Sequence, residues 1–475
     1  MVFSSLFFLY AYLPLCLIVY HLVKKIEHKN TVLLVFSLFF YAWGEPFWVL
    51  QLLISGSLVY LFGRLMAACR PDREQKSRKL FLILGILAAL IPLLVFKYSD
   101  FFIANINAVL GTSLAQPNFA LPIGISFYTF QIISYIVDLY WGNCQVQKRL
   151  DYFLLYQSFF PQLIAGPIVR YTDIEQAMTN RHPSAKDRAL GARRFVAGLA
   201  KKCLIANYAG SLVAQTIESS RLSRLSGLEA LIGLIAFSLQ IYYDFSAYSD
   251  MAIGLGRIFG FHFPENFNYP YIARSVTDFW RRWHVSLSSF FRDYVYIPLG
   301  GNRRHQLVNL CIVWFLTGFW HGASWNFIFW GLYYLVFLIL EKTFLLSALD
   351  RAPRILGHLY MVPITLFGWA LFYFTDLSQL GIFLSRLFAL NGPFMNLEGR
   401  VLLRQNFFFL VLAYLGSLPL LPKLKDLVNR KYSELEIHAS PYYLAANLVQ
   451  ILGLLLLSTA SLAGASYNPF LYFRF

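Results

Sequence analysis

Charged residues are scarce in this chain. Only 13% of its 475 residues are Asp, Glu, Lys or Arg, whereas 58% are hydrophobic and 18% are aromatic. This composition excludes a soluble protein and predicts a polytopic membrane protein. The first 22 residues are apolar but lack a basic leader and a small-residue cleavage site, so we expect a retained first span rather than a signal peptide.

Motifs of several enzyme classes are also missing. The five cysteines form no CxxC and no zinc spacing, which predicts buried free thiols and no metal site. GxSxG, HExxH and P-loop motifs are absent. Gly254-Leu255-Gly256 does not follow a strand–turn–helix pattern, which excludes a dinucleotide fingerprint.

The basic residues are confined largely to short loops, although the net charge is +16. The positive-inside rule explains this pattern better than a nucleic-acid partner does. We therefore expect three stretches to be cytoplasmic and the N-terminus to be extracytoplasmic. Residues 99–120 contain no Lys or Arg and are predicted to form an outer loop. The cytoplasmic stretches are 24–29, 70–79 and 170–202.

Apolar segments recur to the end of the chain. Several are shorter than the ~20 residues that a helical span needs, so some must be tilted or re-entrant. We predict an all-α fold of one domain, residues 1–475, with about ten to twelve crossings. The segments are 1–22, 31–43, 46–68, 79–98, 121–141, 152–169, 195–216, 226–247, 306–320, 325–346, 357–375, 379–390, 405–422 and 441–465.

One uncharged stretch has an awkward length. Residues 306–340 contain no Asp, Glu, Lys or Arg, and His321 lies near their midpoint. Each half would reach only about 22 Å, against a hydrocarbon core of roughly 30 Å. The turn at 321–324 should therefore lie inside the membrane. A titratable residue at that depth is costly and predicts function, and desolvation would keep the imidazole neutral, as a general base requires.

Residues 250–305 are polar and aromatic together and hold seven arginines. They are too polar to span, and part of them is predicted to form an amphipathic helix in the membrane interface. Two interpretations stay open: a positive-inside loop, or a surface that binds a phosphorylated ligand through arginine. His284 repeats the Trp-His pair of His321 and is either interfacial or functional. The arginines are Arg257, Arg274, Arg281, Arg282, Arg292, Arg303 and Arg304.

Two further positions have both a structural and a functional interpretation. Asp244 lies near the end of an apolar run and either orients a partner or forms a structural ion pair with an arginine. The closing residues 468–475 are strongly aromatic. They either anchor the C-terminus at the interface or carry Tyr472 into a membrane cavity.

Several of these segments resemble motifs of one known family, the membrane-bound O-acyltransferase superfamily. Within it the chain is similar to the bacterial branch that includes alginate O-acetylation and peptidoglycan O-acetyltransferase proteins. The resemblance covers almost the whole chain and is densest over 155–335, the expected catalytic core. The motifs are Phe160–Ile168, Pro264–Tyr271, Asp278–His284, Phe291–Asn302 and Thr317–Gly322.

The resemblance implies an acyltransferase whose helices surround a central tunnel. His321 matches the family's catalytic histidine, and His284 matches a second histidine at the cytoplasmic mouth. Tyr472 resembles a tyrosine thought to carry the acyl group in a related system. The implied donor is cytoplasmic acetyl-CoA, bound without any tightly held cofactor. The residues expected to bind the donor are Arg281, Arg282, Trp283, Arg292, Asn302, Arg303 and Arg304.

The expected function is transfer of acetyl across the bacterial inner membrane for O-acetylation of an alginate-like polysaccharide, peptidoglycan or another surface glycan. A soluble extracytoplasmic transferase is the expected partner, besides acetyl-CoA, the acceptor glycan and the lipid bilayer. Two alternatives are a transporter that releases no coenzyme A and a non-catalytic scaffold that recruits the transferase. A transporter would need charged residues within its spans to couple ions, and these are sparse.

Overall fold

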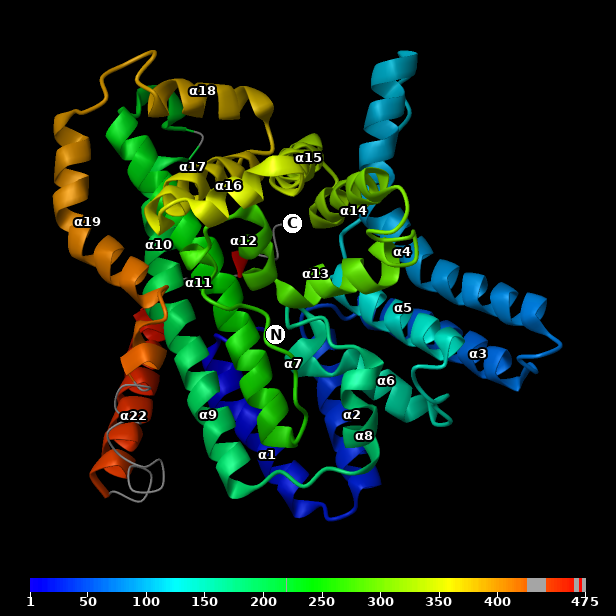
Figure 1. Ribbon diagram of the computed structural model, residues 1–475. Helices are drawn as coiled ribbons and strands as arrows, with labels where there is room; N and C mark the ends of the chain where they lie inside the picture. Colours follow the sequence, from blue (N-terminus) through cyan, green and yellow to red (C-terminus); the bar gives the residue numbers. More distant parts are fainter. Residues whose placement is uncertain (219, 425–440, 465–469, 472–475) are drawn as a thin grey trace. The chain divides into compact units, whose positions relative to one another are not determined.

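The computed structural model describes every residue except 219, 425–440, 465–469 and 472–475 (Figure 1). Helices and no strand occur among the described residues, which confirms the all-α prediction. The chain divides into two compact units. The first comprises 1–195, 248–265 and 289–301, and the second comprises 196–247, 266–288 and 302–475. The assignment of residues 1–475 to one domain stays a prediction.

The first unit is built mainly from the N-terminal helices. Within it α3 packs against α4, and α4 against α5. Its elements are η1 (Phe8–Tyr12), α1 (Leu13–Leu22), α2 (Ile26–Ala42), α3 (Trp48–Ala68), α4 (Gln75–Leu110), α5 (Ile125–Trp141), α6 (Leu150–Ser158), α7 (Phe160–Leu163), α8 (Tyr171–Thr179) and η5 (Arg292–Tyr296).

The second unit holds most of the C-terminal half. Here α14 packs against α15, and α15 against α17. Its elements are η2 (Lys201–Ala206), α10 (Asn207–Thr216), η3 (Leu222–Arg224), η4 (Pro270–Ile272), α12 (Val276–Arg282), α14 (Gln306–His321), α15 (Trp325–Leu340), η6 (Glu341–Leu345), α16 (Leu346–Arg351), α17 (Arg354–Tyr373), α18 (Leu377–Leu387), α19 (Leu397–Gly416) and α22 (Pro441–Gly464).

Three helices contribute residues to both units: α9 (Ala185–Ala200), α11 (Gly227–Phe259) and α13 (Val285–Phe291). The longest of them, α11, runs for 33 residues. Its N-terminal part, up to Ala247, belongs to the second unit and supplies one wall of the pocket described further below.

Six helices among the described residues are long and apolar enough to cross a membrane. They are Trp48–Ala68, Gln75–Leu110, Gly227–Phe259, Trp325–Arg351, Arg354–Tyr373 and Ala445–Gly464. The predicted first span is a run of only 15 residues, Phe8–Leu22, divided between η1 and α1. The total of ten to twelve crossings stays a prediction.

The predicted loop at 99–120 is partly wrong. Helix α4 continues through Asp100 and Asn105 and ends only at Leu110, where Gly111 adopts a left-handed conformation with φ 65°. Polar residues alone do not end a helix, whereas a glycine that takes positive φ does so readily. The drop in hydropathy after residue 98 therefore indicated where the sequence becomes polar, not where the helix ends.

The predicted amphipathic helix within 250–305 is replaced by several short helices. After α11 ends at Phe259, the segment forms η4, α12, α13 and η5. The helical conformation is interrupted between α12 and α13, because Trp283 is extended and His284 has positive φ. Aromatic side chains that we expected at an interface, including Trp280 and Trp283, are buried in the protein.

All five cysteines are free thiols, as predicted. Cys16, Cys144 and Cys203 are buried, but Cys311 on α14 is exposed. The expectation that the thiols are buried therefore holds for only part of the set, because one side of α14 faces away from the protein.

Candidate active site

His321 is the last residue of α14, a helix of 16 residues. Gly322 then adopts an extended conformation, and α15 begins at Trp325. The helix therefore breaks where the length of the uncharged stretch predicted it. The second half is longer than expected, because α15 continues through η6 and α16 as 27 helical residues, Trp325–Arg351. A position of this turn within the membrane stays a prediction.

Glycines allow α14 and α15 to approach closely beside His321. A Cβ atom at Gly318 would overlap the carbonyl oxygen of Phe327, and one at Gly331 would overlap the carbonyl oxygen of Trp314. Small residues at such crossings let helix backbones come into contact, in membranes as in soluble proteins. The close crossing brings Trp330 of α15 against His321 at the end of α14, with ring centroids 4.9 Å apart.

The imidazole of His321 lies among aromatic rings. Its centroid is 4.9 Å from the centroid of Trp320 and 5.3 Å from that of Phe372, and both pairs are edge-to-face. The residue is 6% exposed. Edge-to-face packing fixes the plane of the ring. His321 is thus buried and held in orientation by aromatic neighbours from α14, α15 and α17.

His284 lies in the break between α12 and α13 and has φ 45°. It is 1% exposed, and its Nδ1 is 3.1 Å from Asn266 Oδ1. The same oxygen accepts hydrogen bonds from Ser286 N at 3.3 Å and Ser286 Oγ at 2.9 Å. Because Oδ1 can only accept, Nδ1 must carry the proton. The neutral ring therefore presents Nε2 as a lone-pair nitrogen.

Burial lowers the pKa of His284 to about 3. Desolvation disfavours the imidazolium form, because the charged ring would lose its hydration without gaining a compensating charge. The ring is consequently neutral at physiological pH. Together with the contact from Asn266, this fixes both the protonation state and the tautomer of His284.

Both predicted catalytic histidines contact the same tryptophan. The ring centroid of Trp320 is 5.9 Å from that of His284 and 4.9 Å from that of His321. The two residues are 37 positions apart in sequence but belong to the same compact unit. The structure therefore brings His284 and His321 together. Tyr472, the third predicted catalytic residue, lies outside the described residues.

A carboxylate from another helix fixes the start of α12, the helix that leads to His284. Glu341 accepts hydrogen bonds from Val276 N at 2.6 Å, from Thr277 N at 2.9 Å and from Thr277 Oγ1 at 2.7 Å. Ser275 also caps the helix by accepting a bond from Asp278 N at 3.0 Å. The first turn of a helix has unsatisfied N–H groups and favours negative charge. Glu341 thus holds α12 in register with α15.

A pocket lined by arginines lies beside α12, the helix that immediately precedes His284 in the sequence. Its volume is about 300 Å³, and four arginines come from α12, α17 and the segment before α12. Arg282 pairs with Asp278 at 2.8 Å, whereas Arg274, Arg281 and Arg354 are exposed. The lining residues are Arg274, Ser275, Thr277, Asp278, Arg281, Arg282, Leu346, Leu349, Asp350, Arg354 and Gly357.

The other residues predicted to bind the donor do not line this pocket. Trp283 is buried and stacks on Phe279, with centroids 5.7 Å apart. Arg292, in the first unit, pairs with Asp293 at 2.6 Å. Asn302 accepts a hydrogen bond from Gln306 at 2.6 Å and one from Lys342 at 3.4 Å. The side chains of Arg303 and Arg304 are exposed.

Sequence reasoning missed three residues that organise this region: Asn266, Glu341 and Arg354. Asn266 lies inside the recognised motif Pro264–Tyr271, and its polarity among aromatic residues was a usable signal. Glu341 is the first charge after the uncharged stretch that ends at Leu340. Arg354 had no signal, because it begins a separate helix and meets α12 only in the folded chain.

Asp244 forms a structural ion pair, but its partner is a lysine. Lys202 Nζ lies 2.6 Å from Asp244 Oδ1, and both side chains are almost fully buried. Asp244 Oδ2 also accepts a hydrogen bond from Leu471 N at 2.6 Å. The expectation of an arginine partner is therefore wrong, because η2 brings Lys202 to α11 within the second unit.

Comparison with known proteins places these features in a family. Residues 149–384 match the model of the MBOAT family, membrane-bound O-acyltransferase. The chain is 36% identical to the probable alginate O-acetylase AlgI of Azotobacter vinelandii, covering 100% of both chains. It is 39% identical to the corresponding Pseudomonas aeruginosa protein over 78% of this chain and 72% of that one.

A third relative has a different named acceptor. The chain is 35% identical to the peptidoglycan O-acetyltransferase of Helicobacter pylori, covering 82% of this chain and 80% of that protein. The matched segment 149–384 contains Asn266, His284, His321 and the arginine-lined pocket. The protein described here belongs to the membrane-bound O-acyltransferase family and is a multi-pass membrane acyltransferase.

Proposed function

We propose that this protein transfers acetyl from cytoplasmic acetyl-CoA across the inner membrane for O-acetylation of a cell-envelope or extracellular polysaccharide. The observation that carries the proposal is that the buried rings of His284 and His321 both contact Trp320. An arginine-lined pocket lies beside α12, the helix that immediately precedes His284. The names of the relatives support alginate-like polysaccharide and peptidoglycan as candidate acceptors. Orientation with the N-terminus outside remains part of the proposal.

In the proposed reaction, His321 acts as general base. Its imidazole nitrogen takes the proton of an acceptor hydroxyl, whose oxygen attacks the thioester carbonyl carbon of acetyl-CoA. The carbon–sulfur bond then breaks, and the proton on His321 passes to the departing coenzyme A thiolate. The aromatic surroundings of His321 exclude water, which limits hydrolysis of the thioester.

His284 is proposed to position the donor. Its tautomer is fixed by Asn266, so Nε2 can accept a hydrogen bond but cannot donate one. Arg281 and Arg282 lie within three positions of His284 in the sequence. With its phosphates at these arginines, the donor would extend along α12 and place its thioester near His284. Arginine suits phosphate because its planar guanidinium binds two oxygens at once.

Replacement of His321 tests the catalytic assignment. We expect His321→Ala to lower acetyl transfer from labelled acetyl-CoA by roughly 10²- to 10⁴-fold, because the acceptor hydroxyl loses its base. The measurement is product formation and coenzyme A release by the full-length protein in nanodiscs. His262→Ala is the matched control, because His262 is exposed and belongs to neither pocket nor histidine pair.

Retained acetylation in His321→Ala would refute the assignment, provided that the variant reaches the membrane at normal abundance. The rival transporter hypothesis predicts that even the unaltered protein releases no coenzyme A. The rival scaffold hypothesis predicts that His321 and His284 are dispensable while a soluble transferase is still recruited.

Replacement of Arg281 tests the donor site. Because Arg281 is exposed in the pocket and is not one of the proposed reacting groups, Arg281→Gln should raise KM for acetyl-CoA roughly ten-fold with a smaller change in kcat. Arg193→Gln removes an exposed arginine that does not line the pocket and is not among the residues expected to bind the donor. Equal KM values for the two variants would argue that the pocket does not hold the donor.

A further inference from the structure

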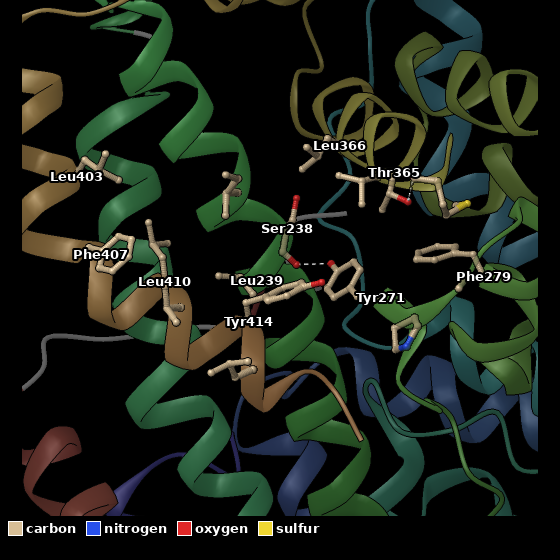
Figure 2. A pocket seen from close by; sticks show the side chains of 17 residues that line it. Ser238, Leu239, Tyr271, Phe279, Thr365, Leu366, Leu403, Phe407, Leu410 and Tyr414 are labelled. Carbon is tan, nitrogen blue, oxygen red and sulfur yellow. Dashed lines mark hydrogen bonds between the residues drawn. The ribbon is translucent and has the colours of Figure 1, made fainter. Parts of the chain in front are cut away.

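Helix α19 leaves an apolar pocket between itself and the rest of the second unit. The pocket has a volume of about 490 Å³ and is lined by residues of α11, η4, α12, α17 and α19. Figure 2 shows Leu403, Phe407 and Leu410 of α19 on one side and Thr365, Leu366 and Phe279 on the other. This volume is within the range of pockets that hold small ligands.

Three polar side chains of the pocket wall are already hydrogen-bonded within the protein. Ser238 Oγ donates to Leu234 O at 2.8 Å, and Thr365 Oγ1 donates to Met361 O at 2.9 Å. The hydroxyl of Tyr271 donates to the carbonyl oxygen of Ser238 (Figure 2). A polar ligand would gain little from groups that are satisfied in this way. The wall therefore suits a hydrocarbon chain.

Hydrogen bonds outside the pocket hold α19 in place. Tyr208 Oη donates to Asn406 Oδ1 at 2.9 Å, and Tyr243 Oη donates to Ala413 O at 2.6 Å. Just before the helix, Asn396 Nδ2 donates to a Glu229 carboxylate oxygen at 3.0 Å. These three contacts anchor α19 on the α10 and α11 side. The space toward α17 is consequently a fixed feature of the fold.

Two arginines extend the apolar pocket into an amphipathic site. Arg400 and Arg404 lie on the same face of α19 as Leu403 and Phe407, because they are three or four residues apart. They line a second hollow of about 340 Å³ that shares Leu403 and Phe407 with the apolar pocket.

Nearby carboxylates do not neutralise these arginines. Glu398 pairs with Arg221 at 3.5 Å, and Glu229 accepts bonds from Ser226 and Asn396. The guanidinium groups of Arg400 and Arg404 have no ion-pair partner within the described part of the chain. Two exposed cations beside a hydrocarbon-lined pocket match an anionic headgroup attached to an acyl chain.

We propose that the α19 pocket binds one anionic phospholipid, with an acyl chain between α19 and α17 and its phosphate at Arg400 and Arg404. The lipid chain contacts Phe279, which stacks on Trp283 next to His284. The bound lipid therefore supports the helix that carries the candidate active site. This inference concerns lipid binding, and its readout does not depend on acetyl transfer.

Lipid retention by the full-length protein tests the proposal. Protein in nanodiscs of phosphatidylglycerol and phosphatidylcholine is extracted, and retained lipid is counted by native mass spectrometry. We expect a phosphatidylglycerol preference that falls roughly ten-fold in Arg400→Gln/Arg404→Gln, because each cation attracts the headgroup. Lys186→Gln/Arg193→Gln is the control for charge, since both residues are exposed on α9 and lie outside the site.

A second pair of variants tests the acyl chain. Leu410→Trp fills the pocket and should reduce retention of both lipids, whereas Leu412→Trp should not, because Leu412 is 66% exposed and does not line the pocket. Unchanged lipid preference in the double arginine variant would overturn the proposal. Equal retention in both tryptophan variants, or a co-purifying polypeptide displaced by Leu410→Trp in place of lipid, would also overturn it.

Discussion

At the scale of single residues, the candidate site depends on two buried, oriented histidines, of which His284 is neutral. Asn266 is fully buried and uses one oxygen to contact both His284 and Ser286. The aromatic rings around His321 leave that residue only 6% exposed. A base in an apolar site must stay unprotonated at working pH to accept a proton, so burial and function are coupled here.

The lowered pKa of His284 predicts a pH dependence of stability. The folded pKa of about 3 lies below the unfolded value near 6.5, so the unfolded state binds more protons between these values. The stability contributed by neutral His284 is complete above about pH 6.5. It should fall, by on the order of 1 kcal/mol per pH unit, as pH drops toward the folded pKa.

A comparison of apparent melting temperatures between pH 7 and pH 4 measures this effect. The advantage of the unaltered protein over His284→Asn should shrink steadily as the solution is acidified. A constant difference across that range would show that His284 does not stay neutral in the folded protein. His262→Ala, at an exposed position, supplies the reference for nonspecific effects.

At the scale of elements, one short helix links the two parts of the candidate site. Helix α12 carries Arg281 and Arg282 and ends immediately before Trp283 and His284. A helix of seven residues is too short to be stable alone, so tertiary contacts must hold it. Glu341 supplies three of these contacts from the end of α15.

Replacement of Glu341 should therefore loosen α12. Glu341→Gln keeps the shape of the side chain but removes the charge that its N–H partners favour. We expect a loss of about 1–3 kcal/mol in stability and a lower kcat for acetyl transfer, since His284 moves with α12. Thermal unfolding and single-turnover transfer provide the two measurements.

Glu398→Gln serves as the comparison for this variant. Its carboxylate pairs with Arg221 at 3.5 Å, and both side chains are about half or more exposed. Such pairs contribute at most about 1 kcal/mol. If Glu341→Gln were as mild as Glu398→Gln, the cap would not be what positions α12.

Two element-scale predictions came from the sequence with different success. The break at His321 followed from counting residues in an uncharged stretch against the thickness of a membrane. The amphipathic helix expected in part of 250–305 is divided among short helices, because a periodic pattern does not reveal where a positive φ interrupts a helix. The positive φ of His284 is such an interruption. The contacts of Asn266 stabilise this backbone conformation, and they form only in the folded chain.

At the scale of the whole molecule, a buried ion pair within the second unit contacts the last described residues, Phe470 and Leu471. Lys202 of η2 pairs with Asp244 of α11, and its ammonium group lies 4.5 Å from the ring centroid of Phe470. Asp244 also accepts the backbone N–H of Leu471. Phe470 is 1% exposed as a result.

Removal of Asp244 alone should destabilise the protein more than removal of both Asp244 and Lys202. Asp244→Ala leaves a buried lysine without its counter-charge and is expected to cost about 3–5 kcal/mol, whereas Lys202→Met/Asp244→Leu should cost less. Carboxypeptidase digestion followed by mass spectrometry adds a local readout. The enzyme should pass Leu471 sooner in Asp244→Ala than in the unaltered protein.

An additive outcome would contradict this account. If the double variant were destabilised by the sum of its two single variants, Lys202 and Asp244 would act independently. Retained protection of Phe470 and Leu471 in Asp244→Ala would show that the ion pair does not anchor the segment.

The sequence by itself determined the all-α membrane class, the helix break at His321 and the family. These follow from composition, from run length and from contiguous motifs, all of which are local properties of the chain. Motif matching also selected His284 and His321 as a pair. The distances between them, however, did not follow from their spacing of 37 residues.

Only the tertiary structure decided which residues meet. It placed both histidines on Trp320, put Arg281 and Arg354 in the lining of one pocket, and assigned Lys202 rather than an arginine to Asp244. It also formed the apolar pocket beside α19 next to Arg400 and Arg404, which have no ion-pair partner among the described residues. Hydrophobic and charge patterns specify faces and depths, but contacts between distant segments depend on how helices cross, which small residues and buried hydrogen bonds set together.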